Sequence, residues 1–233
     1  MIHAIKASRS LKAKFKLNED ALTASVFERL MYLPKELIQH IFSKALSHYN
    51  IPDLDLYQIE SIEFWPHWSA KETSNVYFVE PDVFISTKLK HIIIEAKRYD
   101  ENQQSKDQWQ KQITAYNNEF ESKDNEQKLI FIALGGLSNK ELEELIINEN
   151  KYLIYKCHWR WILRSVLSLK DEIGRSKIYI NSNWSISNVL EDIILIFRLF
   201  GYSTAPWFDY FMKPVGFDSK ILSNLNFVPL CKK

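Results

Sequence analysis

The sequence predicts an α/β fold in which helices flank a mixed central sheet, and two observations lead to this prediction. Three apolar segments, at residues 56–65, 76–86 and 90–97, have the composition and length of successive strands. They are followed by a helical segment at 108–120 and a further apolar strand at 128–134. A strand–helix–strand unit at the centre of a chain is typical of a sheet that carries helices on its faces.

The segments on either side of this centre are mostly predicted as helices. Asn18 is a suitable N-cap for a helix over 19–33, which Pro34 helps to end, and a second helix is expected over 35–49. Beyond the centre we expect a short helix at 139–147, a strand at 152–157, a helix from about 159 and a last helix at 187–200.

The chain is long enough for one good-sized hydrophobic core, because 46% of its 233 residues are apolar. We find no internal repeat, low-complexity tract or clear linker, so a single domain over 1–233 is predicted. Within it, a core at about 17–135 is expected to precede a mainly helical C-terminal extension at about 137–233.

Composition excludes several classes of function. With five glycines, the chain contains neither a dinucleotide-binding nor a phosphate-loop glycine motif. Cys157 and Cys231 are far apart and unpaired in sequence, as in a reduced cytosolic protein. The most apolar run, at 193–200, is too short to span a bilayer. We therefore expect a cytoplasmic protein without a membrane partner.

The net charge of +1 means that any nucleic-acid contact must come from a local cluster of charge.

Three residues near the centre of the chain form the candidate catalytic group. Asp82 follows Pro81 within the predicted strand segment 76–86, and Glu95 and Lys97 end the next segment. Side chains alternate along a strand, so Glu95 and Lys97 point to the same face, and Asp82 can reach that face from the neighbouring strand. Two carboxylates and an ammonium group beside a divalent metal suit the hydrolysis of a phosphodiester.

The acid-x-lysine pattern alone has little specificity. It occurs four more times, in polar segments: Glu121-Lys123, Glu126-Lys128, Glu149-Lys151 and Asp218-Lys220. Glu95-Ala96-Lys97 differs because it ends an isoleucine-rich strand one hairpin after Pro81-Asp82. The alternative interpretation of Glu95 and Lys97 is an ordinary solvated ion pair on an edge strand.

The order helix, three strands, helix, strand, with Pro81-Asp82 before Glu95-Ala96-Lys97, resembles the PD-(D/E)xK phosphodiesterase superfamily. Restriction endonucleases, archaeal Holliday-junction resolvases and many DNA-repair and phage-defence nucleases belong to it. The resemblance covers about residues 17–135. It implies a restriction endonuclease-like fold and an endonuclease that cleaves DNA with Mg²⁺ or Mn²⁺, serving restriction, phage defence or DNA repair.

The resemblance also implies roles for individual residues. Asp82 and Glu95 would bind the metal together with the main-chain carbonyl of Ala96, and Lys97 would assist the attacking water. Many members add a glutamate from the first helix. A helical wheel places Glu19 on the apolar face of that helix and Glu28 nearly opposite, so Glu19 is the predicted contributor. The alternative for Glu19 is a favourable charge in the first helical turn.

A glutamine on the helix after the third strand is a further expected supporting residue. Gln108, Gln112 and Tyr116 share one helix face, and Gln108 is chosen because it is nearest to the loop. A polar helix surface explains the glutamines about equally well.

Two other segments have ambiguous roles. The first seventeen residues hold five basic side chains and no acidic one: Lys6, Arg9, Lys12, Lys14 and Lys16. This arm suits a phosphate backbone, although a solvated tail is the favoured interpretation. The aromatic residues of 65–68 suit an unpaired base, but packing at the core and rim is favoured.

Competing functions remain open at the level of sequence. One is a non-catalytic nucleic-acid-binding or assembly subunit of the same fold, and another is an RNA-cleaving defence effector. No feature separates DNA from RNA, because a fold does not determine the substrate. A homodimer, or partner proteins of a defence or repair complex, also stay open.

Overall fold

The structure, a computed structural model, describes residues 17–49, 51, 53–98, 102–120, 128–137, 139, 141–175 and 181–203. The basic segment between Lys6 and Lys16 lies outside the described residues, as does Cys231.

The central sheet has six strands in the order β1-β4-β5-β6-β8-β7. They are β1 (Ile59–Phe64), β4 (Val83–Thr87), β5 (Lys90–Ala96), β6 (Lys128–Leu134), β7 (Glu143–Ile147) and β8 (Asn150–Cys157). The pairs β1/β4, β4/β5 and β7/β8 are antiparallel, whereas β5/β6 and β6/β8 are parallel. The sheet is therefore mixed, which confirms the predicted α/β class. A separate two-stranded sheet is formed by β2 (Trp68–Ser69) and β3 (Phe78–Val79).

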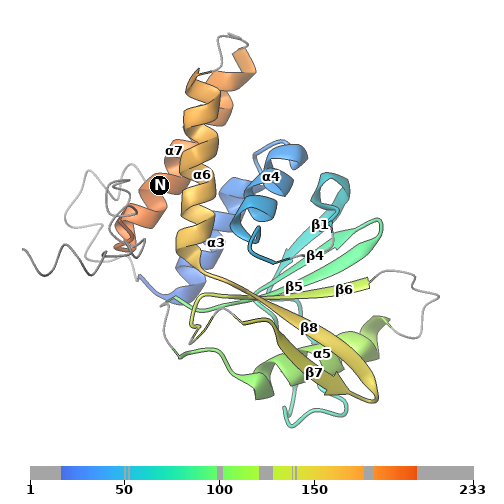
Figure 1. Ribbon diagram of the computed structural model, residues 1–233. Coiled ribbons are helices and arrows are strands. Elements are labelled where there is room, and N and C mark those ends of the chain that lie inside the picture. The colour runs from blue at the N-terminus through green and yellow to red at the C-terminus, as the bar shows by residue number, and fades with distance from the viewer. Residues whose placement is uncertain are drawn as a thin grey trace, which may run out of the picture. The chain divides into compact units, whose positions relative to one another are not determined.

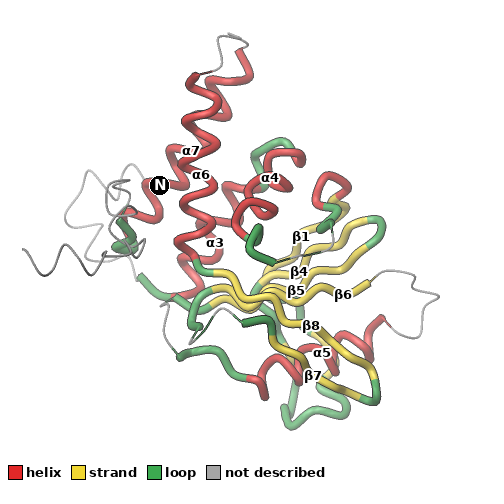
Figure 2. The backbone as a smooth tube through the Cα atoms, viewed as in Figure 1, coloured by secondary structure: helices red, strands yellow, loops and turns green. Residues whose placement is uncertain are grey.

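Helices cover both faces of the sheet (Figure 1). They are α3 (Glu19–Leu30), α4 (Lys35–Ala45), α5 (Lys106–Phe120), α6 (Trp159–Arg175) and α7 (Asn181–Leu199), with a short 3-10 turn, η1 (Leu56–Gln58). Helices α3, α4, α6 and α7 pack on one face, and α5 packs on the other (Figures 1 and 2).

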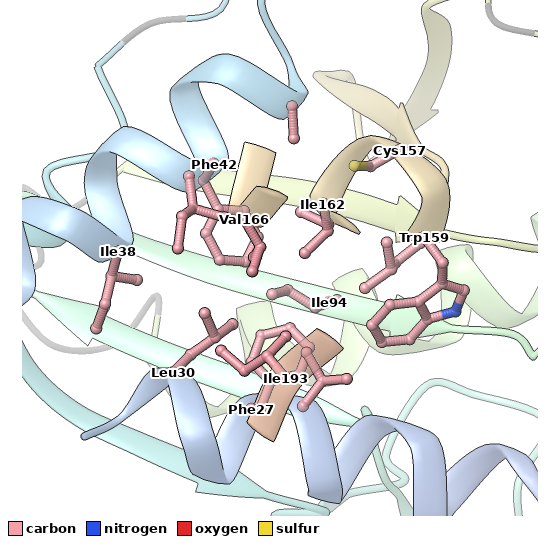
Figure 3. Close-up of a cluster of buried hydrophobic side chains, with 14 of the residues drawn as sticks. Phe27, Leu30, Ile38, Phe42, Ile94, Cys157, Trp159, Ile162, Val166 and Ile193 are labelled. Atoms are coloured by element: carbon pink, nitrogen blue, oxygen red, sulfur yellow. The ribbon is translucent and has the colours of Figure 1, made fainter. Parts of the chain in front are cut away.

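Alternation along β5 divides its side chains between two buried clusters. Ile92 and Ile94 belong to the larger cluster, which α3, α4, α6 and α7 share (Figure 3), and Ile93 belongs to the smaller cluster beneath α5. All three isoleucines are fully buried, and each contributes about 1.5–3 kcal/mol of hydrophobic stabilisation. Because β5 is covered on both faces, polar side chains at its end lie in a dry environment.

The turn between β4 and β5 is held by a buried carboxylate. Asp55 is 1% exposed, and its Oδ2 atom accepts hydrogen bonds from the Thr87 hydroxyl at 3.1 Å and the Leu89 amide at 3.2 Å. The Gln58 side chain donates to Oδ1 of Asp55 at 2.7 Å. These bonds stabilise the turn, whose geometry sets the register of the hairpin and hence which side chains face each other across β4 and β5.

The predicted short helix at 139–147 is wrong, because Glu143–Ile147 is the edge strand β7. Asn148 and Glu149 both have positive φ, as in a two-residue hairpin turn, and they bring β7 back onto β8. Leu145 and Ile147 then pack in the cluster beneath α5. Strand pairing thus outweighs the helix propensity of the Glu-Leu-Glu-Glu segment, and the sheet extends into the predicted C-terminal extension.

The segment predicted as one strand at 76–86 is divided in the structure. Phe78–Val79 is β3, and β4 begins only at Val83. Pro81 lies between them and has no amide hydrogen to donate to a sheet. The break moves the chain from the small sheet to the central one just before Asp82.

The first helix begins as predicted. Asn18 caps α3 by accepting a 3.1 Å hydrogen bond from the Ala21 amide. The helix ends at Leu30, three residues before the expected end, and the last helix, α7, begins at Asn181 instead of Ser187. Among the helices of the described ranges, none combines the length and the apolarity that a membrane crossing requires.

Candidate active site

Asp82 and Glu95 face each other at the ends of β4 and β5. Val83 pairs with Ile94 in antiparallel register, so the next pair outward joins Asp82 with Glu95. Both acids are buried, with exposed fractions of 8% and 1%. The structure thus brings together the two carboxylates that the sequence placed on adjacent strands.

Two donors fix the orientation of the Asp82 carboxylate. The Ala96 amide donates to Oδ2 at 2.7 Å, and the indole Nε1 of Trp65 donates to Oδ1 at 3.2 Å. Each carboxylate oxygen keeps a second lone pair for another partner.

Lys97 brings a partly buried positive charge to these acids. Its Nζ atom donates to Oε1 of Glu95 in a short contact, to Oε1 of Glu19 at 3.1 Å and to the Ala96 carbonyl at 3.1 Å. The lysine side chain is 15% exposed. One ammonium group therefore joins acids from β5 and from α3.

The backbone of Lys97 is held by residues from two distant segments. Its amide donates to the Leu134 carbonyl at 2.7 Å, and its carbonyl accepts a 2.8 Å hydrogen bond from the indole of Trp159. Gly135 and Gly136 have φ values of +72° and +64°, and a Cβ atom on them would lie 2.1 Å from the Lys97 carbonyl oxygen and 2.6 Å from the Lys97 Cβ. Only glycine fits this close approach, so the turn after β6 is shaped around the lysine.

Glu19 lies at the start of α3, within reach of the end of β5. Besides the contact with Lys97, its Oε2 atom accepts a 3.2 Å hydrogen bond from the Arg98 amide. Glu28, one of the two glutamates compared on the helical wheel, has an exposed side chain and pairs with its neighbour Arg29 at 2.8 Å. The two glutamates thus lie on the sides of the helix that their positions predicted.

Three acids lie close enough to share one cation. One carboxylate oxygen each from Glu19, Asp20 and Asp82 lies within 4.8 Å of the others. Ligand oxygens at about 2.1 Å from an octahedral Mg²⁺ are separated by about 3–4 Å, so small side-chain movements would suffice. The set consists of hard oxygen donors, which suit a hard cation such as Mg²⁺, Ca²⁺ or Mn²⁺.

This set differs from the ligands expected from the sequence. It includes Asp20, which was not predicted, and it does not include Glu95. The two oxygens of Glu95 instead accept hydrogen bonds from Lys97 and Gln112. The Ala96 carbonyl, the other expected ligand, accepts from Lys97.

The crowding of buried acids shifts their pKa values. Burial, followed by repulsion from the Glu95 carboxylate, raises the pKa of Asp82 to about 7. Burial also raises the pKa of Glu95, although Lys97 opposes this shift. Burial disfavours the charged form of Lys97, but Glu95, Asp82 and Glu19 together outweigh it and raise the pKa of the lysine. Such shifts are concentrated at functional sites, where charge is gathered in a dry environment.

Gln112, which shares a helix face with the predicted Gln108, is the glutamine of α5 that contacts Glu95. Nε2 of Gln112 donates to Oε2 of Glu95 at 2.6 Å, and Gln112 is 1% exposed. Gln108 lies one turn nearer the helix start and lines a surface cavity. A second glutamine, Gln104, donates from its Nε2 atom to the Glu95 carbonyl at 2.9 Å.

Several neighbours of the site were missed because their local sequence does not distinguish them. Asp20 is an exposed acid in a first helical turn, where acids are common. Gln104 lies in a polar loop. Trp159 belongs to a segment that carried no recognised activity. The position of Gln112 on the same helix face as Gln108 was the one feature of the sequence that could have identified a missed neighbour of the site.

The three aromatic residues of 65–68 have different environments. Trp68 is 6% exposed and packs in the cluster beneath α5, as the favoured interpretation predicted. Trp65 binds Asp82 through its indole, a role that was not predicted. The exposed ring of His67 stacks on Phe78 with 4.1 Å between ring centroids.

No family model matches the chain. Among curated proteins, the chain is similar to an uncharacterized protein of Pasteurella multocida (strain Pm70). The two are 29% identical over 213 residues, which cover 83% of this chain and 75% of the other. The description of that protein names no activity, so the case for function rests on the geometry of the site.

Proposed function

We propose that the protein is a metal-dependent phosphodiesterase that hydrolyses DNA, with Asp82, Glu95 and Lys97 at the centre of its active site. The observation that carries this proposal is the convergence of two buried carboxylates and one ammonium group at the ends of neighbouring strands. A solvated edge-strand ion pair does not describe this arrangement, because β5 lies between β4 and β6 and Glu95 is 1% exposed. Burying such charges is costly, so a functional requirement accounts for them better than stability does.

Asp82, Glu19 and Asp20 are the residues that fit a divalent metal, since their oxygens approach one another within 4.8 Å. Such a cation would make bound water more acidic and offset the charge that develops on the phosphate. Glu95 stays a predicted further ligand, and in the structure it holds Lys97 and Gln112.

The protein groups have distinct roles in this proposal. Lys97 keeps its proton, because its pKa is raised, and its ammonium orients the attacking water and stabilises negative charge on the phosphate. The Ala96 amide and the Trp65 indole hold Asp82 in place. Trp159 and the Gly135–Gly136 turn hold the lysine backbone.

The sheet that presents these groups is proposed to be a restriction endonuclease-like core. Two features support this assignment: the order α3, β1, β4, β5, α5, β6, and the parallel β5–α5–β6 unit directly after the acid-x-lysine segment.

The purified chain should cleave labelled DNA when Mg²⁺ is added, and cleavage should stop when EDTA removes the metal. Asp82→Ala, Glu95→Ala and Lys97→Ala should each lose cleavage while remaining folded. Lys90→Ala, at the opposite end of β5, is the matched control and should cleave normally. Unchanged cleavage by Glu95→Ala would contradict the proposal. DNA binding without cleavage by any preparation would instead favour the non-catalytic subunit.

A further inference from the structure

A cavity of about 340 Å³ opens beside the candidate active site, between the β2–β3 hairpin and the start of α5. Its lining comes from both segments: Asn75, Val79, Glu80, Ser105, Asp107, Gln108, Lys111 and Gln112. This volume lies within the range of pockets that hold small organic groups.

The cavity is connected to the active site through two lining residues. Gln112 donates to the Glu95 carboxylate at 2.6 Å. Glu80 precedes Asp82 by two residues, in the segment that leads from the small sheet into β4. A group seated in the cavity would therefore lie next to a phosphodiester held at the acids.

The lining suits a neutral polar group better than a phosphate. Lys111 is the basic residue of the lining, and it is paired with Asp107 at 2.6 Å. Glu80 adds a further negative charge, which disfavours an anion in the cavity. Amide and hydroxyl side chains, supplied by Gln108 and Ser105 among others, are the groups that hydrogen-bond the edges of nucleobases.

Gln112 itself is incompletely satisfied. The residue is 1% exposed, its Nε2 atom is used by Glu95, and its Oε1 atom has no hydrogen-bond partner among the described residues. A buried carbonyl oxygen without a partner carries a cost of about 1–3 kcal/mol, which a ligand amino group would remove.

The hairpin beside the cavity exposes apolar side chains. Val76, Tyr77 and Phe78 are 82%, 86% and 41% exposed, and they lie between the lining residues Asn75 and Val79 in sequence. Adjacent exposed apolar side chains mark interaction sites. Aromatic rings of this kind bind unpaired bases by stacking, at little cost in sequence preference.

The hairpin is anchored, so it can present these rings in a fixed position. The Ser69 amide donates to Glu119 of α5 at 2.8 Å, and Asn118 of α5 donates to the Lys71 carbonyl at 2.6 Å.

We propose that the cavity between the β2–β3 hairpin and α5 receives an unpaired nucleobase of a DNA substrate, with Tyr77 at its rim. This inference rests on the proposed function, because the adjacent phosphodiester is taken to be the one that is cleaved. The preferred substrate is then single-stranded or locally unpaired DNA.

The test is a pair of binding titrations in which fluorescence anisotropy reports the fraction of probe bound. The probes are a fluorescein-labelled single-stranded deoxyoligonucleotide and the blunt duplex of the same sequence, in EDTA to prevent cleavage. Tyr77→Ala and Gln108→Ala should each weaken single-strand binding, Tyr77→Ala by about tenfold. Neither change should alter the affinity for the duplex.

Matched controls are present in the chain. Tyr32→Ala removes a tyrosine that is 75% exposed on the turn after α3 and does not line the cavity, and Gln110→Ala removes an exposed glutamine of α5. Both should bind like the wild type. Equal losses for single strand and duplex, or no loss with Tyr77→Ala, would overturn the inference.

Cleavage assays separate this inference from the proposed function. Wild-type protein with Mg²⁺ should cut a duplex that contains one unpaired nucleotide faster than a fully paired duplex. Cleavage of both at one rate would overturn the base cavity and leave the phosphodiesterase proposal in place. Failure to cut any DNA would overturn the phosphodiesterase proposal itself.

Discussion

Gln112 on α5 donates a 2.6 Å hydrogen bond to Oε2 of Glu95, the more deeply buried of the two facing strand acids. The bond satisfies one oxygen of the carboxylate, while the Lys97 ammonium contacts the other oxygen. Because each oxygen has a different partner, the helix and the strand end together determine how the carboxylate is oriented. Loss of either partner would leave part of a buried charge unsatisfied.

Gln112→Ala should therefore lower the cleavage rate by about tenfold or more, the scale expected when support for a metal site is removed. The variant also leaves Oε2 of Glu95 without its hydrogen-bond donor, so the melting temperature of the protein should fall. Gln110→Ala, on the exposed side of the same helix, should change neither quantity. Single-turnover cleavage and thermal unfolding measure the two effects. A normal rate in Gln112→Ala would show that Glu95 does not depend on α5 for its orientation.

Metal binding should depend on pH because of Asp82. Its pKa is raised to about 7, and a metal ligand must lose its proton, so affinity should fall about tenfold for each pH unit below 7. Calorimetry in buffers with different ionisation enthalpies should detect proton release on binding near pH 6. If the affinity for the metal does not change between pH 5 and about 8, Asp82 is not a metal ligand that loses its proton in this range.

The same raised pKa predicts how the metal-free protein responds to pH. A carboxyl whose pKa is higher in the folded state than in the unfolded state stabilises the fold below the unfolded value, near 3.8. This contribution is lost as the pH rises through about 7. In EDTA, thermal stability should therefore decrease over this interval, and excess Mg²⁺ should restore it at pH 8. Asp82→Asn should show a weaker decrease.

Sequence patterns predicted the elements whose cause is local. The continuous apolar run of β6, Lys128–Leu134, was predicted with its observed bounds, because a strand covered on both faces needs apolar side chains at nearly every position. The convergence of Asp82 and Glu95 was also predictable, since alternation and a short hairpin determine which side chains share a face.

Other features depend on contacts between distant segments. Glu143–Ile147 became a strand because the Asn148-Glu149 turn pairs it with β8, although its residues favour a helix. The choice between Gln108 and Gln112 depends on how α5 lies over β5, which the helix pattern does not contain. The contact of Trp159 with Lys97 joins residues 62 positions apart.

Glu19 and Glu28 offer a comparison within one helix. Glu19→Gln should lower the cleavage rate by about tenfold or more, because the side chain contacts Lys97 and belongs to the acid group that fits a metal. Glu28→Gln should leave the cleavage rate nearly unchanged, since substitutions at exposed positions change stability by about half a kcal/mol or less. Steady-state cleavage at several Mg²⁺ concentrations distinguishes weaker metal binding from slower chemistry. Equal silence in both variants would remove Glu19 from the proposed metal site.

Trp159 links the C-terminal helices to Lys97, the proposed catalytic lysine, and Trp159→Phe tests this link. The phenyl ring keeps most of the packing in the larger buried cluster, but it cannot donate to the Lys97 carbonyl, which accepts from the indole at 2.8 Å. The free energy of unfolding should fall by about 1–3 kcal/mol, which is the cost of a buried acceptor that loses its donor. The cleavage rate should also fall at temperatures far below the melting point, because the lysine backbone is less constrained. Trp184→Phe, at a position that is 73% exposed on α7, is the control and should affect neither stability nor rate. A Trp159→Phe protein that melts earlier but cleaves at the wild-type rate would limit the tryptophan to a structural role.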